Sequence, residues 1–149
     1  MVESTAHAQW HGDLIGGAGT IDRVGSGTFG PLDVSWAART GEESGKTTPE
    51  ELLAAAHAAC YAMSLAGELA AKGSAPDHVD VRAVVTLDQV EDGSHRIVAS
   101  ELLARARVTG IDQAALQEVA EIASDGCTLS KLIEASAKVT VNAQLEGGS

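Results

Sequence analysis

The stretch TTPEELLAAAHAACYAMSLAGELAA, from Thr47 to Ala71, limits what this chain can fold into more than any other feature. It is long enough to cross a bilayer as a helix, and it is apolar on nearly every side, whereas a soluble helix normally keeps one polar face. However, alanine dominates the stretch, and it also carries His57, Glu68 and two leading glutamates. These residues disfavour insertion into lipid. We therefore predict a long central helix that is buried in a soluble protein, with no membrane association.

The two ends of this helix carry clear local signals. Thr48 suits the N-cap position, Pro49 suits the first helical position, and Glu51 completes a capping box. Gly73 can adopt the left-handed conformation that commonly ends a helix. The helix should therefore begin directly after a loop at Ser44–Thr48 and end near Gly73.

Strand and helix signals also lie on both sides of the long helix. Short apolar runs between glycines precede it and indicate strands joined by turns. Two alternating runs flank Asp92-Gly93 after it and predict a β-hairpin. Asp112 can cap a further helix, which Gly126 should end. The predicted strands are His7–His11, Thr20–Val24, Leu32–Ala38, Val79–Leu87, Arg96–Val108 and Ala137–Leu145, and the predicted shorter helices are Gln113–Ser124 and Thr128–Glu134.

This order of elements predicts an α+β fold, because strands and helices are segregated along the chain rather than alternating regularly. The length of 149 residues suits one domain, so we expect residues 1–149 to form a single domain. An apolar fraction of 44% is ordinary for a globular protein and argues against disorder.

The charge of the chain excludes one class of partner. The formal net charge is -11, and no cluster of Lys and Arg is present that could displace counterions from phosphates. We therefore expect no nucleic-acid binding. The first ten residues, MVESTAHAQW, contain neither a basic start nor an apolar core, so we expect no secretory signal and a cytoplasmic location. The two cysteines should then be reduced thiols.

Two other patterns are better explained by structure than by function. Gly25–Gly30 matches G-x-G-x-x-G by letter, but Pro31 and a strand-like run follow it where a nucleotide-binding helix should begin, so we expect a turn. The five histidines show no paired spacing with one another or with cysteine that is typical of a zinc site. His57 lies three residues before Cys60 on the predicted helix, and we expect a core or interface histidine there.

Cys60 and Cys127 are the residues that most suggest chemistry. Cys60 lies in the middle of the long helix among alanines, which leave room for close approach. Cys127 opens a short helix, where unpaired N–H groups favour a thiolate. If the two sulfurs meet, they form a redox pair, one attacking and one resolving. A reactive thiolate needs a cation nearby, and Arg39, Lys46 and Lys131 are the candidates, of which planar, permanently charged Arg39 suits best.

Taken together, these residues resemble the OsmC/Ohr family of thiol peroxidases over nearly the whole chain. The matching segments are WHGD from Trp10, Arg39, TPEELL from Thr48, AAAHAAC ending at Cys60, and GCTLSK from Gly126 to Lys131. Because Arg39 lies directly before the long helix rather than in the first hairpin, the chain is more similar to the OsmC branch. Thr128 is one departure, since the family usually has proline there, but both sulfurs stay in place.

The resemblance implies reduction of organic hydroperoxides, and less efficiently of hydrogen peroxide, by two cysteines without metal, flavin or other cofactor. It implies that Cys60 is the peroxidatic thiolate, that Cys127 is the resolving thiol, and that Arg39 and Glu50 are the activating pair. It also implies a dithiol reductant, for which we expect a lipoyl type. Arg39 would favour the thiolate and stabilise the departing alkoxide, while Glu50 would orient the guanidinium.

Glu50 and the apolar helix together predict a homodimer. Ten helical residues separate Glu50 from Cys60, a rise of about 15 Å, so the carboxylate cannot reach the Cys60 site of its own helix. Either Glu50 only decorates the helix N-terminus, or a second subunit delivers it. One chain would also struggle to cover a helix that is apolar all round. Two such helices side by side would solve both problems, which agrees with the intertwined dimers of the family.

Two functions of other classes remain open from the sequence. The fold could be a non-catalytic module that binds a small apolar ligand, which requires the two sulfurs to be far apart or unreactive. It could also be a thiol redox sensor, in which the disulfide is a signal rather than a step of turnover. The acidic charge argues against a sensor that binds DNA directly.

Overall fold

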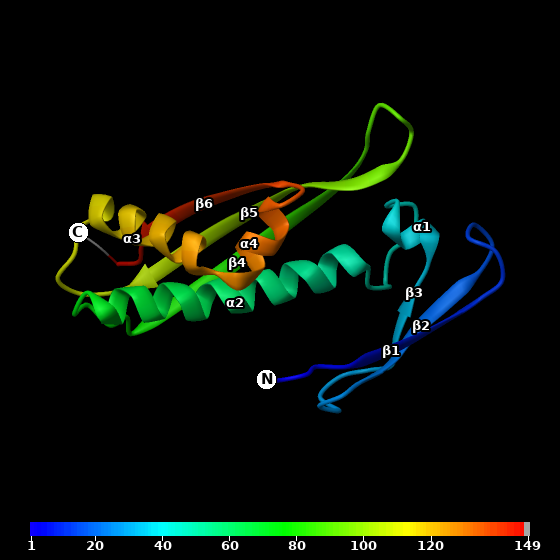
Figure 1. The fold of residues 1–149 in the computed structure, drawn as a ribbon, viewed down its shortest axis with the longest axis horizontal. Helices are drawn as coiled ribbons and strands as arrows, with labels where there is room; N and C mark the ends of the chain where they lie inside the picture. The colour runs from blue at the N-terminus through cyan, green and yellow to red at the C-terminus, as the bar shows by residue number, and fades with distance from the viewer. Residues whose placement is uncertain (148–149) are drawn as a thin grey trace. The chain divides into compact units, whose positions relative to one another are not determined.

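The computed structural model describes residues 1–147 and contains two compact units, the first Met1–Leu52 and the second beginning at Leu53. The chain order is three strands, a short helix, a long helix, a hairpin, two helices and a last strand (Figure 1). Two separate three-stranded sheets, β1-β2-β3 and β4-β5-β6, carry these strands. The predicted α+β architecture with a long central helix is therefore confirmed.

The first unit is built on a small antiparallel sheet. It consists of β1 (Ala6–His11), β2 (Ala18–Val24) and β3 (Leu32–Val34), followed by α1 (Trp36–Arg39). The predicted strand Leu32–Ala38 is thus only half correct. Ser35 caps a helical turn, because its hydroxyl accepts a hydrogen bond from the Ala38 N–H at 3.1 Å. The segment Gly25–Gly30 connects β2 to β3, as expected for a turn.

The second unit places helices on a mixed sheet. Strands β4 (His78–Gln89) and β5 (His95–Arg107) form the predicted hairpin, and β6 (Lys138–Leu145) pairs in parallel with β5. The helices are α2 (Pro49–Ala71), which starts in the first unit, α3 (Gln113–Gly126) and α4 (Thr128–Glu134). Helix α3 continues through Gly126, which we had expected to end it, and the break falls at Cys127. Helix α4 begins at Thr128, as predicted.

Helix α2 is terminated as the sequence indicates. The Thr48 hydroxyl accepts from the Glu51 N–H at 3.0 Å, while the Glu51 carboxylate accepts from the Thr47 hydroxyl at 2.6 Å. At the other end Gly73 has a φ of 81°. The N–H groups of Gly73 and Ser74 bond the carbonyls of Ala70 and Leu69, which is the Schellman pattern.

The core of the second unit lies between the helices and one face of the sheet (Figure 1). Tyr61, Leu65 and Leu69 project from α2 at intervals of four residues, so they form one stripe. They pack with Leu102 and Ala104 of β5 and with apolar residues of α3. This stripe fixes the rotation of α2 and thereby sets where Cys60 points.

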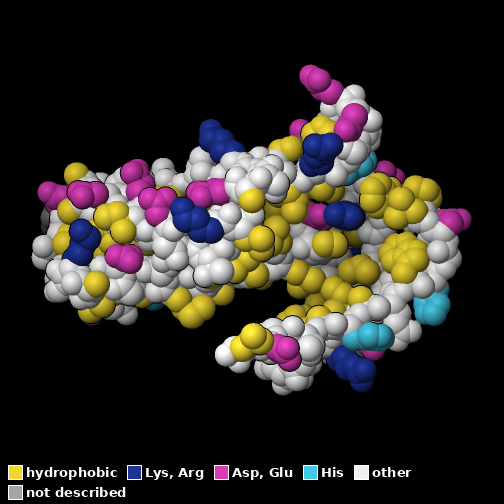
Figure 2. Space-filling model, viewed as in Figure 1, with side chains coloured by type: hydrophobic (Ala, Val, Ile, Leu, Met, Phe, Trp, Pro, Cys, Tyr) yellow, Lys and Arg dark blue, Asp and Glu magenta, His cyan; other side chains and the backbone are white. Residues whose placement is uncertain are grey.

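Within one chain α2 is buried along this stripe, at His57, which continues the stripe toward the start of the helix, and at Glu50. By length and composition the helix is apolar enough to cross a membrane, and 22% of its most apolar stretch is buried. Met63, on the other side, is 71% exposed, and Figure 2 shows further hydrophobic side chains at the surface. Because α2 contributes the centre of a packed core, we interpret it as a core helix rather than a membrane span.

Candidate functional site

The two cysteines lie next to each other although 67 positions separate them in sequence. Cys60 is partly buried in the middle of α2, and Cys127 is buried at the N-cap of α4. Their sulfur atoms are 3.4 Å apart. A disulfide bond is about 2.0 Å long, so the sulfurs need to approach by only about 1.4 Å to bond. This proximity argues against the alternative of a ligand-binding module with separated cysteines.

The surroundings of Cys127 favour its thiolate. Burial raises the pKa of the Cys127 thiol, but hydrogen bonds to the sulfur from the Ser130 backbone and hydroxyl, from the Cys60 side chain and from the Leu129 backbone outweigh it. The net result is a pKa below the ordinary value for cysteine. Ser130 and Leu129 lie in the first turn of α4, the helix that Cys127 opens.

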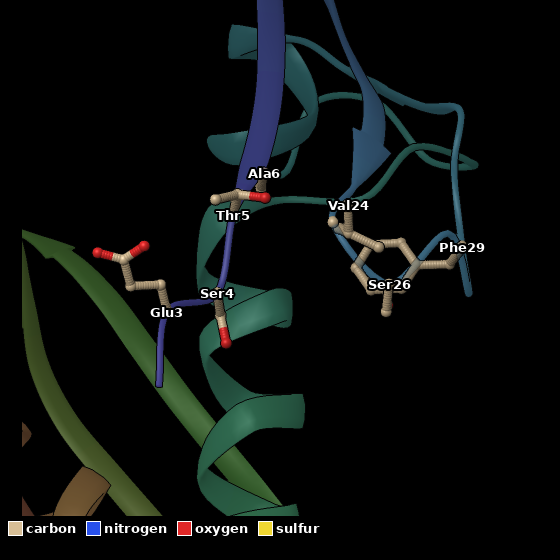
Figure 3. A pocket seen from close by; sticks show the side chains of 8 residues that line it. Glu3, Ser4, Thr5, Ala6, Val24, Ser26 and Phe29 are labelled. Carbon is tan, nitrogen blue, oxygen red and sulfur yellow. The ribbon is translucent and has the colours of Figure 1, made fainter. Parts of the chain in front are cut away.

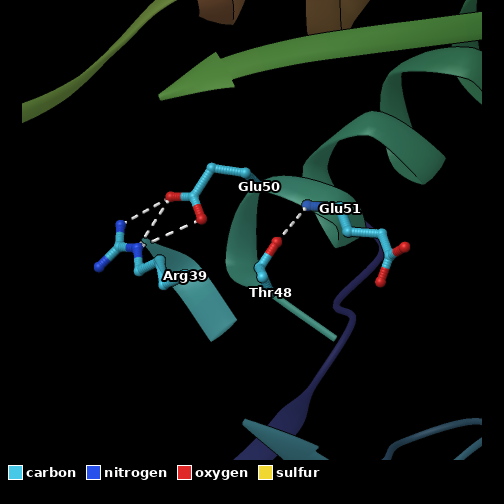
Figure 4. Close-up of polar contacts among 4 residues, drawn as sticks. All are labelled: Arg39, Thr48, Glu50 and Glu51. Carbon is cyan, nitrogen blue, oxygen red and sulfur yellow. Dashed lines mark hydrogen bonds and ion pairs between the residues drawn. The ribbon is translucent and has the colours of Figure 1, made fainter. Parts of the chain in front are cut away.

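Arg39 and Glu50 form the second predicted pair (Figure 4). The Arg39 Nη2 and Nε atoms both donate to Glu50 Oε1, at 2.7 and 3.0 Å, and Nε also approaches Oε2 at 3.2 Å. The Glu50 side chain is 8% exposed and that of Arg39 is 36% exposed. A buried carboxylate therefore fixes one edge of a guanidinium whose remaining surface is open to a ligand.

An apolar pocket of about 450 Å³ adjoins Arg39 in the first unit. Two tryptophans, a leucine, a valine and a proline line most of it, so it suits a ligand with a hydrocarbon body and a polar group near the guanidinium. The residues that line the pocket are Trp10, Gly12, Leu14, Val34, Ser35, Trp36, Arg39 and Pro49.

A larger hollow of about 670 Å³ lies between the N-terminal segment and the β2–β3 connection (Figure 3). Residues 3–6, 24–26 and Phe29 line it, and Glu3 is the one ionisable side chain among them. None of the predicted site residues contributes to it, so it offers no chemistry that relates to the cysteines.

The four predicted site residues thus form two pairs, one in each compact unit: Arg39 with Glu50, and Cys60 with Cys127. The other two candidate cations have different partners. Lys46 pairs with Glu43 at 2.9 Å, and Lys131 lies 3.9 Å from Glu134 on the surface. Among residues 1–147, no three His, Cys, Asp or Glu side chains gather where they could hold a metal ion.

The sequence did not predict a group of three buried serines. Ser100, Ser124 and Ser130 are buried; Ser100 and Ser130 are hydrogen-bonded to His57, and Ser124 is hydrogen-bonded to Ser130. The motif GCTLSK contains Ser130, so its spacing of three from Cys127 was a usable signal. Ser100 lies in a strand without any such pattern. His57 is fully buried, as we expected for a core histidine.

Comparison with known proteins identifies the family. The family model described as OsmC-like protein matches residues 41–142. Peroxiredoxin OsmC from Escherichia coli (strain K12) is 34% identical over 145 residues, which cover 97% of this chain and 98% of that protein.

Solved structures with 24% sequence identity show the same fold. An organic hydroperoxide resistance protein OsmC from Legionella pneumophila aligns with a TM-score of 0.73, covering 94% of this chain and 96% of that one. The organic hydroperoxide resistance protein OhrB of Bacillus subtilis aligns with a TM-score of 0.71, covering 94% and 98%. From its sequence and its fold, the chain belongs to the OsmC family.

Proposed function

We propose that this protein is a thiol-dependent peroxidase that reduces organic hydroperoxides, and hydrogen peroxide less well. Its family supports a peroxiredoxin-type enzyme that acts on a peroxide and is recycled by a thiol reductant. The observation that carries the finer proposal is the 3.4 Å separation between the sulfurs of two free cysteines, Cys60 in α2 and Cys127 at the start of α4.

The first step is attack by the Cys60 thiolate on the distal oxygen of the hydroperoxide. The O–O bond breaks, the sulfur is oxidised to a sulfenic acid, and the alkoxide leaves and takes up a proton to become an alcohol. Cys60 is the partly exposed member of the pair, whereas Cys127 is buried, so Cys60 is the sulfur that a peroxide can reach. Arg39 would stabilise the negative charge that develops on the departing oxygen.

The second step joins the two cysteines. The Cys127 thiolate attacks the sulfur of the Cys60 sulfenic acid, the S–O bond breaks, and hydroxide leaves as water after gaining a proton. An external dithiol then reduces the disulfide by exchange, and we propose a lipoyl-type dithiol in the cytoplasm for this role. The lowered pKa of Cys127 supports its part in this step, because it increases the ionised fraction of the attacking sulfur.

We further propose that the complete site forms in a homodimer in which the two units act as one OsmC-like domain. Glu50 and Cys60 are ten residues apart on α2, a rise of about 15 Å. The partner subunit would therefore supply Glu50 and, through the pair described above, Arg39. The exposed alanine-rich side of α2 supports this arrangement, since a second copy would cover it.

The substrate class follows from the apolar pocket beside Arg39. Its hydrocarbon walls would hold an alkyl or aryl group, which hydrogen peroxide lacks. The proposal is tested by measuring kcat/KM for cumene hydroperoxide, tert-butyl hydroperoxide and hydrogen peroxide with dihydrolipoamide as reductant. We expect turnover with all three and the highest kcat/KM with the organic peroxides. A lack of dithiol-dependent turnover with any peroxide would refute the proposal.

Replacing Cys127 with serine should allow one reaction and then stop the enzyme. The variant should consume about one equivalent of cumene hydroperoxide per chain, because Cys60 still attacks but no thiol resolves its sulfenic acid. Mass spectrometry should then find Cys60 overoxidised or in a mixed disulfide with the reductant. Normal turnover of this variant with a dithiol would show that Cys127 is not the resolving residue.

Replacing Arg39 with alanine should slow peroxide reduction at neutral pH by about a hundredfold, as when an oxyanion donor is removed from an active site. The loss should shrink at alkaline pH, where a thiolate forms without help from a cation. Arg39→Lys is the matched control, since it keeps the charge but cannot make the bidentate pair with Glu50. A loss of equal size at every pH would mean that Arg39 acts on the transition state or the fold alone.

A further inference from the structure

Two hydroxyl groups of α2 bond carbonyl groups of α3, the helix that leads into Cys127 (Figure 1). The Tyr61 hydroxyl donates to the Ala120 carbonyl at 2.9 Å, and the Ser64 hydroxyl donates to the Ala123 carbonyl at 2.7 Å. Both alanines are fully buried. Side chains of α2 therefore hold the last two turns of α3 at two points.

The two hydrogen bonds differ in what each carbonyl would otherwise bond. The Ala120 carbonyl lies inside α3, where the N–H group four residues later is its helical donor. In a helix that continued, the Ala123 carbonyl would likewise accept from the N–H of Cys127. That N–H instead donates to the Ser124 carbonyl at 3.1 Å. The Ser64 hydroxyl therefore satisfies one of the carbonyls that a helix end leaves without a regular donor.

The end of α3 decides where the second sulfur lies. Cys127 has extended backbone angles, with φ at -77° and ψ at 121°, and it is both the C-cap of α3 and the N-cap of α4. From this position its sulfur lies 3.4 Å from that of Cys60. A shift of the last turn of α3 would move the Cys127 backbone, and with it the sulfur.

Ser64 and Cys60 belong to the same face of α2. They are four residues apart, so their side chains project on one side of the helix. This face also reaches the residue before Cys127, because a Cβ atom added to Gly126 would lie 3.7 Å from the Ser64 hydroxyl oxygen. One turn of α2 thus carries both the attacking sulfur and the hydroxyl that holds the segment with the resolving sulfur.

We propose that Ser64 is a positioning residue for the resolving step, because by capping the end of α3 it holds Cys127 within reach of Cys60. This inference rests on the proposed role of Cys127 as the resolving thiol. The Ser64 hydroxyl forms and breaks no covalent bond. It acts by keeping the two reacting sulfurs in place, which raises the rate of a step between them.

The resolving step competes with a second oxidation of Cys60. In the resolving step the S–S bond forms, the S–O bond of the sulfenic acid breaks, and water leaves. If Cys127 is out of reach, a second hydroperoxide molecule transfers an oxygen atom to the Cys60 sulfur, which gives a sulfinic acid and an alcohol. A dithiol cannot reverse this product. Correct placement of Cys127 therefore protects Cys60 from irreversible loss.

The test measures this competition. Reduced protein without reductant is exposed to increasing concentrations of cumene hydroperoxide, and peptide mapping quantifies the Cys60–Cys127 disulfide and the sulfinic acid. The midpoint is the peroxide concentration that gives equal amounts of the two products. The initial rate of peroxide loss reports the attack by Cys60 separately. The variant is Ser64→Ala, in which alanine favours the helix. Tyr61→Phe is the matched control, because it also removes one hydroxyl that bonds a carbonyl of α3.

Ser64→Ala should consume peroxide at the initial rate of the unmodified protein but have a midpoint about tenfold lower. A factor of ten is the upper range for the contribution of one neutral hydrogen bond. The shift should be equal from pH 6 to 9, because the contact holds the backbone and does not ionise a thiol. Tyr61→Phe should keep the unmodified midpoint even where it lowers the melting temperature, since its carbonyl partner lies inside the helix.

A second pair of variants separates the hydroxyl from the shape of the side chain. Ser64→Thr and Ser64→Val place side chains of nearly the same shape on α2, and only threonine keeps a hydroxyl. The threonine variant should have a midpoint close to that of the unmodified protein. The valine variant should behave like Ser64→Ala.

Three outcomes would overturn the inference while leaving the peroxidase proposal intact. These are an unchanged midpoint in Ser64→Ala, an equally large shift in Tyr61→Phe, and equal midpoints in the threonine and valine variants. By contrast, if peroxide produces neither the disulfide nor an oxidised Cys60 in the unmodified protein, the proposed function itself fails.

Discussion

Replacing Cys60 with serine is expected to abolish peroxide consumption. A hydroxyl oxygen is a far weaker nucleophile toward the O–O bond than a thiolate, and the remaining cysteine, Cys127, is only 1% exposed. The variant should therefore show neither turnover with a dithiol nor the single equivalent of peroxide consumption that we expect from Cys127→Ser. The measurement is loss of cumene hydroperoxide, followed with and without dihydrolipoamide.

The substitution should not disturb the fold, because serine is close to cysteine in size and Cys60 is only partly buried. Circular dichroism and thermal unfolding of Cys60→Ser beside Cys127→Ser provide the control. Full peroxidase activity in a folded Cys60→Ser protein would end the assignment of Cys60 as the attacking residue.

Two individually inactive variants should restore activity to each other if Glu50 acts on the cysteine of the partner subunit. Glu50→Ala and Cys60→Ser are mixed, unfolded and refolded together. In a mixed dimer one site combines the intact Cys60 of the first chain with the intact Glu50 of the second, and the other site has lost both. Random pairing makes about half of the dimers mixed, each with one complete site, so about a quarter of the original activity should return.

This experiment requires Glu50→Ala to be severely impaired alone, which follows if its bidentate contact holds Arg39 in place. The pair Cys60→Ser and Cys127→Ser is the matched control. These two sulfurs lie together within one chain, so their mixture should recover nothing. Arg39→Ala is tested with Cys60→Ser in the same way. No recovery with Glu50→Ala, in mixed dimers confirmed by native mass spectrometry, would place Glu50 in the same chain as the cysteine it serves or outside the site.

Elements with local signals were the ones that the sequence predicted well. The ends of α2 and the start of α3 could be predicted from the sequence, because the residues that fix them contact their own neighbours in the chain. These residues are Thr48, Gly73 and Asp112. The error at Leu32–Ala38 arose because Ser35 can continue an extended run or cap a helix with equal ease, and packing decides between the two.

The site was predictable as a set of residues but not as a geometry. The motifs around Cys60 and Cys127 named both sulfurs, yet no periodic pattern states that residues 67 positions apart meet. Their meeting depends on how α2, α4 and β5 pack, and this packing also creates the contacts of His57 with Ser100 and Ser130. Residues that meet from different elements have no characteristic spacing in the sequence. His57 could therefore be predicted as a core residue, but its hydrogen bonds to Ser100 and Ser130 could not be predicted.

The proposal that Cys60 and Cys127 form a working redox pair is tested most directly by counting thiols. The reduced protein, which has two cysteines per chain, is denatured and titrated with a thiol reagent before and after one equivalent of cumene hydroperoxide, and the peptides are mapped without reduction. We expect two thiols per chain before the peroxide and close to none afterwards, with Cys60 joined to Cys127 of the same chain. Two thiols remaining after the peroxide, or loss of thiols without that disulfide, would contradict this account.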